Sequence, residues 1–162
     1  MILLKALKLL FMHPLDVLGH SLIKANGRPD YSTKTTDAYH QQNIFIGKNV
    51  QLAGYLNPGS GGKITIGDNV AIGHYTSIIA EQYDGIRDSR QDVRALPRKY
   101  REITIGNGVW IGNSCIIIAN VGEGSVIGAG TVVVKDIPSF VVAFGNPAEV
   151  KAHRIVFSAD RV

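Results

Sequence analysis

Aliphatic residues recur every six positions along the middle of the chain. Each repeat has Ile or Val, then Gly, two variable residues, a small or β-branched residue and any sixth residue. Seven such hexads begin at Ile46, Ile66, Ile72, Ile105, Ile111, Val121 and Ile127. Six is neither the 3.6-residue period of an α-helix nor the two-residue period of a strand. The pattern therefore indicates a repeated supersecondary unit, as in solenoid proteins.

Each hexad predicts one short strand and one corner, so three hexads make a full turn of a triangular coil. The first residue points inward and stacks on its equivalent in the next coil. The fifth residue must be small because it faces the crowded interior near a corner, and glycine allows the backbones to approach closely. One coil alone leaves its strand edges unpaired, so coils must stack. We predict an all-β solenoid, a parallel β-helix. Seven hexads that keep both positions argue against the alternative, a chance run of strands in a sandwich.

Two interruptions and a terminal turn divide the chain. The spacing from Ile117 to Val121 is four residues, which tightens one corner. Residues 80–102 have many charges and no hexads, and we expect a protruding loop there, since long excursions from a solenoid are usually functional or oligomer contacts. A Gly-Asn-Pro turn at 145–147 leaves the coil. The predicted units are an N-terminal segment at 1–40, a β-helix at 41–145 and a tail at 146–162.

The N-terminal segment has one apolar helical face. Leu3, Leu7 and Phe11 lie on this face, and two lysines lie off it. The apolar run ends at Pro14, which makes it too short to span a bilayer, and it has no small-residue cleavage site of a signal peptide. We expect a short helix that packs on the body of the protein. Peripheral contact with a membrane is the alternative.

Composition adds limits on partners and chemistry. The 162 residues carry a net charge of +4, which favours anionic partners, but there is no basic run interleaved with aromatics to suggest nucleic-acid binding. Cys115 is the only cysteine, which excludes an intramolecular disulfide and agrees with a cytoplasmic location. Cys115 also takes the small fifth position of its hexad. We expect it to be a buried packing residue and not a nucleophile.

Two stretches carry a family resemblance: VWIGNSC at 109–115 and VGEGSVIGAGTVVVKDIPSFVVAFGNPAEV at 121–150. With the hexads, they resemble the hexapeptide-repeat acyltransferases, and within these the maltose and galactoside O-acetyltransferase branch. The resemblance covers roughly residues 44–154. It implies a left-handed β-helix, a homotrimer with its active site in the groove between neighbouring subunits, and acetyl-CoA as the acyl donor. The acceptor hydroxyl would enter beside it.

The resemblance also implies four CoA-binding residues. Trp110 offers a flat apolar wall, and packing in the trimer is a second, compatible role for it. Asn113 and the small Ala129 let the pantetheine arm run close to backbone amides. Lys135 can meet a phosphate as a point charge.

Acylation of a sugar hydroxyl needs a general base, and imidazole titrates near the operating pH. The family's histidine lies in the excursion loop, but its position falls on Tyr83, which is followed by Asp84. His74 lies at an outward position near the start of the loop and is our first choice of base; a surface or trimer-contact role is the alternative. His40 is a weaker candidate. Tyr83 and Asp84 would position the acceptor or orient the base.

A second departure from the family is Glu149, which stands where Lys or Arg is common. Lys151 and Arg154 could supply the missing charge near the nucleotide end of CoA. The histidines lack the His…HxxxxH spacing of an intersubunit zinc site, so we expect no metal.

Two functions of different classes follow. The first is a CoA-dependent O-acyltransferase that acetylates a hydroxyl of a sugar in a cell-surface glycan or its precursor. The alternative is a non-catalytic hexapeptide-repeat trimer, which keeps the fold but acts as a binding or scaffold protein. Tyr83 in the place of histidine, together with Glu149, is the main support for this alternative.

Overall fold

The computed structural model describes residues 38–84, 90 and 92–155. The predicted N-terminal helix lies in residues 1–37, outside the described part of the chain. The first described element is a 3-10 helix, η2 (Ala38–Asn43), which leads directly into the first strand. Within the described residues, no helix has the length and apolar character needed to cross a bilayer.

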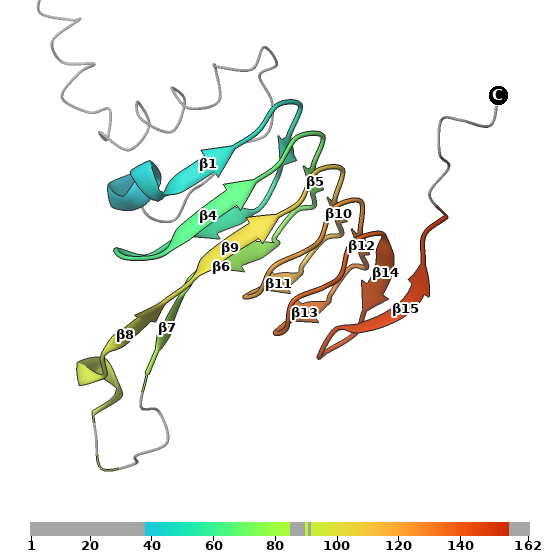
Figure 1. The fold of residues 1–162 in the computed structure, drawn as a ribbon. Helices are drawn as coiled ribbons and strands as arrows, with labels where there is room; N and C mark the ends of the chain where they lie inside the picture. The colour runs from blue at the N-terminus through green and yellow to red at the C-terminus, as the bar shows by residue number, and fades with distance from the viewer. Residues whose placement is uncertain (1–37, 85–89, 91, 156–162) are drawn as a thin grey trace, which may run out of the picture.

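Three sheets of mainly parallel strands form the sides of the body of the protein (Figure 1). Sheet A contains β1 (Ile44–Ile46), β4 (Lys63–Ile66) and β9 (Glu102–Ile105). Sheet B contains β2 (Gln51–Leu52), β5 (Ala71–Ile72), β10 (Trp110–Ile111), β12 (Val126–Ile127), β14 (Val141–Phe144) and the antiparallel β15 (Glu149–His153). Sheet C contains β3 (Tyr55–Asn57), β6 (Ser77–Ile79), β11 (Ile116–Ile117) and β13 (Val132–Val133).

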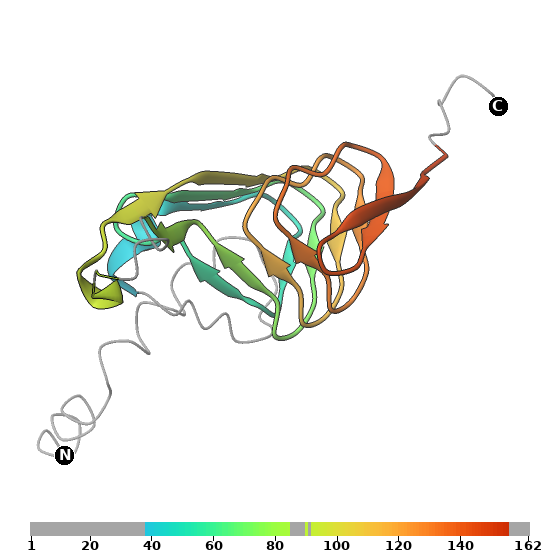
Figure 2. The same cartoon turned by 90° about the horizontal axis from the view of Figure 1, so that it is seen from below.

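Along the chain, successive strands visit sheets A, B and C in turn and then return to A. The strand register aligns equivalent hexad positions: Ile111 pairs with Ile72 on one side and with Ile127 on the other. Where strands are too short to be continuous, isolated parallel bridges at Val121 and Ile137 extend sheet A. The three-sided coil predicted from the hexads is therefore confirmed, and Figure 2 shows its stacked turns.

The interior of the coil is filled by the first and fifth residues of the hexads. Ile105, Ile111 and Ile117 have almost no exposed surface. Cys115 is also fully buried, and its Sγ lies 3.2 Å from the carbonyl oxygen of Gly128. The prediction that Cys115 is a packing residue is confirmed.

Polar residues at the fifth position bond to the backbone of the corners. The Thr76 hydroxyl donates to the Gly112 carbonyl at 2.7 Å and accepts from the backbone N–H of Cys115 at 3.1 Å. The Thr131 hydroxyl donates to the Gly128 carbonyl at 2.6 Å. A buried hydroxyl without a partner is costly, so these bonds explain how threonine can share an interior otherwise made of aliphatic side chains.

The corners stack as tightly as the strands. A Cβ atom on Gly112 would lie 2.6 Å from the backbone nitrogen of Ala129 in the next coil, so no larger residue fits there without a backbone shift. Corner side chains also bond from one coil to the next. The Asn107 side-chain oxygen accepts from the backbone N–H of Asp68 at 2.8 Å, and Asn113 accepts from His74 in the same way at 2.9 Å. These contacts join neighbouring coils in addition to the sheet hydrogen bonds.

The predicted excursion contains an antiparallel hairpin of β7 (Glu81–Tyr83) and β8 (Arg98–Tyr100), with a short 3-10 helix, η3 (Val93–Ala95), between them. The hairpin projects beyond the coils (Figure 1). Its root is closed by a hydrogen bond from the Arg101 N–H to the Ala80 carbonyl at 2.8 Å. The chain thus leaves and re-enters the coil at neighbouring positions, on the corner between sheets C and A.

The last described strand lies in the segment expected as a tail. β15 pairs antiparallel with β14, with Val142 opposite Ala152 and Phe144 opposite Glu149. All five residues of β15 are exposed. The segment from residue 146 therefore adds an edge strand to sheet B before the chain passes beyond the described residues.

Candidate functional site

The hairpin has one face on which four side chains from both strands gather. Because alternate residues of a strand point to the same side, Glu81 and Tyr83 share a face of β7, and their pairing partners Tyr100 and Arg98 share it on β8. We call these four residues the anchored face of the hairpin. Gln82 and Lys99 lie on the opposite face.

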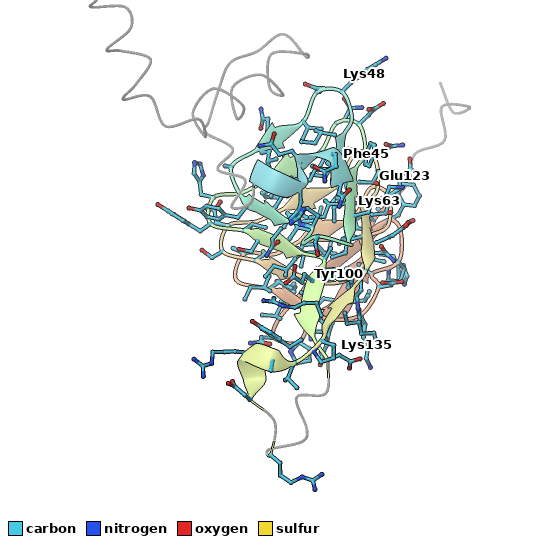
Figure 3. The ribbon with its side chains drawn as sticks, turned by 90° about the vertical axis from the view of Figure 1, so that its left-hand side faces the viewer. Phe45, Lys48, Lys63, Tyr100, Glu123 and Lys135 are labelled. Atoms are coloured by element: carbon cyan, nitrogen blue, oxygen red, sulfur yellow. The ribbon has the colours of Figure 1, made fainter. Side chains whose placement is uncertain are left out.

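A glycine-rich turn, residues 58–62, holds the anchored face against the coil. Gly59 has φ of +64°, and a Cβ atom added to it would lie 2.7 Å from the Cβ of Glu81. The Tyr100 ring packs on Gly61, and its hydroxyl is hydrogen-bonded to the Ser60 hydroxyl at 2.5 Å between the oxygens. Figure 3 shows Tyr100 toward the side of the coil from which the hairpin projects. The turn therefore fixes the base of the hairpin.

Further from the coil, the anchored face carries a cation on an aromatic ring. The guanidinium carbon of Arg98 lies 4.0 Å from the centroid of the Tyr83 ring, within the range of a cation–π interaction. The same guanidinium donates through Nη1 to the Glu81 carboxylate in a salt bridge. The Glu81 side chain is only 16% exposed, so its surroundings restrict its movement and it holds the Arg98 guanidinium in place. The residue at the expected place of histidine is thus packed beneath an arginine.

His74 lies on a different corner of the coil, between sheets B and C. It is exposed and stands beside Tyr75, with 6.3 Å between the ring centroids. β6 separates it from Tyr83, because His74 precedes this strand and Tyr83 follows it. Within one chain, His74 and the pair Tyr83 and Asp84 therefore occupy the two corners at opposite edges of sheet C.

Tyr75 adds a local backbone feature to the corner of His74. Its φ is +61°, in the left-handed region that few aromatic residues adopt. Asn69 and Ser114 have similar φ values at the equivalent hexad position, so the conformation belongs to the corner and not to Tyr75 alone. The coil geometry thus orients His74 and Tyr75 toward solvent.

The four residues expected to bind CoA do not gather in one place on a single chain. Trp110 lies on the outer side of sheet B and is 58% exposed. Asn113 and Ala129 are exposed on the corner between sheets B and C, the corner of His74. Lys135 follows β13 on the corner between sheets C and A, the corner from which the hairpin projects (Figure 3).

A polar network surrounds the position of Lys135. The neighbouring Asp136 carboxylate accepts from the backbone N–H of Asn120 at 2.9 Å and from its side-chain amide at 3.1 Å. These bonds, with a smaller effect of the Arg101 charge, hold the pKa of Asp136 below its usual value. Arg101 also bonds to the Ile118 carbonyl at 3.3 Å. The corner beneath the hairpin therefore presents two cations and one ionised carboxylate.

The charges that could compensate for Glu149 are already engaged. Lys151 forms a salt bridge with Glu149 itself at 2.6 Å and lies over the Phe144 ring. Arg154 donates to the backbone carbonyl of Gly124. Lys151 and Arg154 thus connect the end of the described chain to the coil. Their positive charges already interact with groups of the same chain.

Sequence reasoning missed Glu81 and Arg98 as members of the site. The Pro-Gly-Ser-Gly-Gly run at 58–62 could have been read as a tight turn, but its contact with Glu81 and Tyr100 requires the fold. Within the described part of the chain, no three His, Cys, Asp or Glu side chains are grouped so that they could hold a metal ion.

The chain is similar in sequence to proteins named as acetyltransferases. It is 39% identical over 112 residues to the galactoside O-acetyltransferase of Escherichia coli K12, which covers 67% of this chain and 53% of that protein. The chain spans about half the length of the curated relatives that it matches. No family model matches the chain.

Solved structures resemble the fold. A maltose O-acetyltransferase from Clostridium difficile 630 aligns with a TM-score of 0.61 and 33% identity, covering 70% of this chain and 60% of that chain. A hexapeptide-repeat-containing acetyltransferase from Vibrio cholerae, complexed with acetyl coenzyme A, aligns with a TM-score of 0.63 and 28% identity, covering 70% and 62%. These matches confirm the resemblance that the hexads indicate.

Proposed function

From the homology of this chain to galactoside and maltose O-acetyltransferases within the hexapeptide-repeat acyltransferases, we propose that it is an acetyl-CoA-dependent O-acetyltransferase. The acceptor would be a hydroxyl of a sugar, in a cell-surface glycan or its precursor. The observation that carries the proposal is the structural similarity to the Vibrio cholerae acetyltransferase, a protein complexed with acetyl coenzyme A. We propose a left-handed sense for the coil and a cytoplasmic location.

The distribution of the site residues supports a homotrimer. His74, Asn113 and Ala129 lie on one corner, and Lys135 and the hairpin lie on another, across the width of sheet C. A neighbouring copy that brings its own corner against this one would form a groove lined by both sets of residues. Trp110, exposed on sheet B, supplies an apolar wall for such a groove or for the contact between copies.

In the proposed reaction, neutral His74 removes the proton of the acceptor hydroxyl as its oxygen attacks the thioester carbonyl. A C–O bond forms and the C–S bond breaks, and the imidazolium returns the proton to the leaving thiolate. Backbone amides of the groove hold the oxyanion of the tetrahedral intermediate. Tyr83, the last residue of β7, and Asp84, which follows it, position the acceptor.

Two measurements test this proposal. Acetyl-CoA should raise the melting temperature if the groove binds it, and thiol release over a panel of sugars reports turnover. Replacing His74 by Ala should lower kcat by about 10²–10⁴-fold, the usual contribution of a general base. The control is His153→Ala, which removes an exposed histidine of β15. Unchanged turnover in His74→Ala would show that another group is the base.

A second candidate function rests on one specific observation. The residue at the family's catalytic position is Tyr83, and its ring is covered by Arg98. A hexapeptide-repeat trimer that binds a glycan or a partner without catalysis would show this arrangement. Binding of sugars without any thiol release, in the presence of acetyl-CoA, would favour this function over the transferase.

A further inference from the structure

Arg98 keeps an unoccupied hydrogen-bonding edge. Its Nη1 is bonded to Glu81, while its Nε and Nη2 have no partner among the described residues. The Arg98 side chain is 44% exposed. Neighbouring N–H groups of a guanidinium match the two oxygens of a carboxylate and bind them in parallel.

The arginine is also held in one orientation before any ligand arrives. Tyr83 supports the face of the guanidinium, Glu81 fixes one end, and Glu81 itself rests against Gly59 of the turn. A surface arginine normally loses rotamer freedom when it binds, and a pre-ordered one loses less. The anchored face therefore has the rigidity expected of a recognition element.

Arg98 and Tyr83 together suit an anion that carries hydroxyl groups. On the anchored face the charged side chains are Arg98 and Glu81, and Lys99 adds a cation on the opposite face of the same strand. Tyr83 is 42% exposed, and its hydroxyl has no hydrogen-bond partner within the described residues. It can bond to a sugar hydroxyl while its ring remains under the guanidinium. Arg98 thus offers two neighbouring N–H donors for an anion, and Tyr83 offers a hydroxyl that suits a sugar.

We propose that Arg98, held by Glu81 and Tyr83, binds the carboxylate of an acidic sugar. The assignment rests on the proposed function, since it specifies the class of acceptor: a uronic acid or another carboxylated sugar. In a transferase, the bound carboxylate would position a hydroxyl of the same sugar for acetylation. Binding itself requires only Arg98 and the side chains of Glu81 and Tyr83 that hold it, so it can be measured whether or not acetyl transfer occurs.

The experiment compares two probes that differ in one group. Methyl β-D-glucuronide and methyl β-D-glucoside are titrated into the 162-residue protein without acetyl-CoA, and binding is followed by NMR of the arginine side chains and by calorimetry. The glucuronide should bind at least about tenfold more tightly than the glucoside, as expected of a charge-assisted bidentate contact. Equal affinities, or no glucuronide binding, would overturn the proposal.

Variants identify the residue responsible. Arg98→Gln removes the charge and should weaken glucuronide binding by about tenfold, and Arg98→Lys keeps the charge but loses the fork and should weaken it less. The glucoside should bind each variant as it binds the wild type. The matched control is Arg94→Gln, which removes an exposed arginine of the same excursion, paired only with Asp92 among the described residues. If Arg94→Gln has the same effect as Arg98→Gln, the contact is general electrostatic attraction and the proposal is wrong.

A third probe distinguishes the type of anion. Glucose 6-phosphate carries a phosphate on the same kind of ring, and binding of this probe without binding of the glucuronide would overturn the assignment to a carboxylate.

If Arg98→Gln does not fold, as judged by its melting curve, Arg98→Lys alone decides the outcome. The melting shift with acetyl-CoA is recorded separately, so a protein that binds glucuronide but not acetyl-CoA contradicts the proposed function and leaves this inference intact.

Discussion

In the coils, almost every inward side chain stacks on an equivalent residue in the next turn, whereas the hairpin has no repeated neighbour on either side. Ile111 lies between Ile72 and Ile127, and all three are buried. Tyr83 and Arg98 contact each other across two strands and remain about half exposed. The coils gain stability from burial, and the hairpin depends on a few directed contacts. This difference leaves the hairpin residues available for binding.

The largest expected effect comes from the centre of the coil. Ile111→Ala removes a fully buried side chain from the middle of sheet B and should lower the free energy of unfolding by about 2–5 kcal/mol. The control is Ile116→Ala, which changes an outward residue that is 43% exposed and should cost less than about 1 kcal/mol. Urea denaturation followed by circular dichroism measures both, and equal losses would mean that the coil interior is not the main source of stability.

A corner hydroxyl should have a smaller effect. Thr76→Val keeps the side-chain shape but leaves the Gly112 carbonyl and the Cys115 N–H without their buried partner. The expected loss is about 1–3 kcal/mol. Thr65→Val makes the same change on the outward side of sheet A and should be nearly neutral. If both variants unfold at the same urea concentration, the Thr76 bonds contribute nothing net.

The hairpin should tolerate loss of its arginine. Arg98→Gln breaks a partly exposed salt bridge and a cation–π contact, and we expect the free energy of unfolding to fall by less than about 1 kcal/mol. The same denaturation curves provide the measurement. A loss as large as that of Ile111→Ala would show that the hairpin is part of the cooperative core, and it would remove the distinction between the two regions.

The smallest effect concerns pH. The pKa of Asp136 is lowered in the folded protein from an ordinary value of 3.8, mainly by hydrogen bonds from Asn120. Its contribution to stability is therefore present above pH 3.8 and is lost as the pH falls through the folded pKa. The group is exposed, so the contribution should be below about 1 kcal/mol. Asp136→Asn should be less stable than the wild type at pH 7, and the difference should shrink by pH 2. If the difference in free energy of unfolding between the two proteins stayed the same from pH 7 to pH 2, ionised Asp136 would not be the group that stabilises the fold.

The coil could be predicted from the sequence because its rule is local. Ile111 and Cys115 each follow from a hexad position, and the structure buries both. The hairpin could not be predicted in the same way, because Tyr83 and Arg98 are far apart in sequence and share no pattern. The four expected CoA residues show a related limit. Trp110 and Asn113 are only three positions apart, yet Trp110 lies on sheet B and Asn113 on the corner that follows it, so sequence distance does not indicate whether they face the same side of the coil.

The closed root of the hairpin has a consequence for the evolution of this fold. Ala80 and Arg101 are joined by a backbone hydrogen bond, so the coil closes whatever lies between them. The segment between them can therefore gain, lose or exchange residues, and so come to bind a new ligand, without disturbing the stacked coils. The corner between sheets C and A is therefore a position at which the inserted sequence can change while the backbone of the coil stays closed.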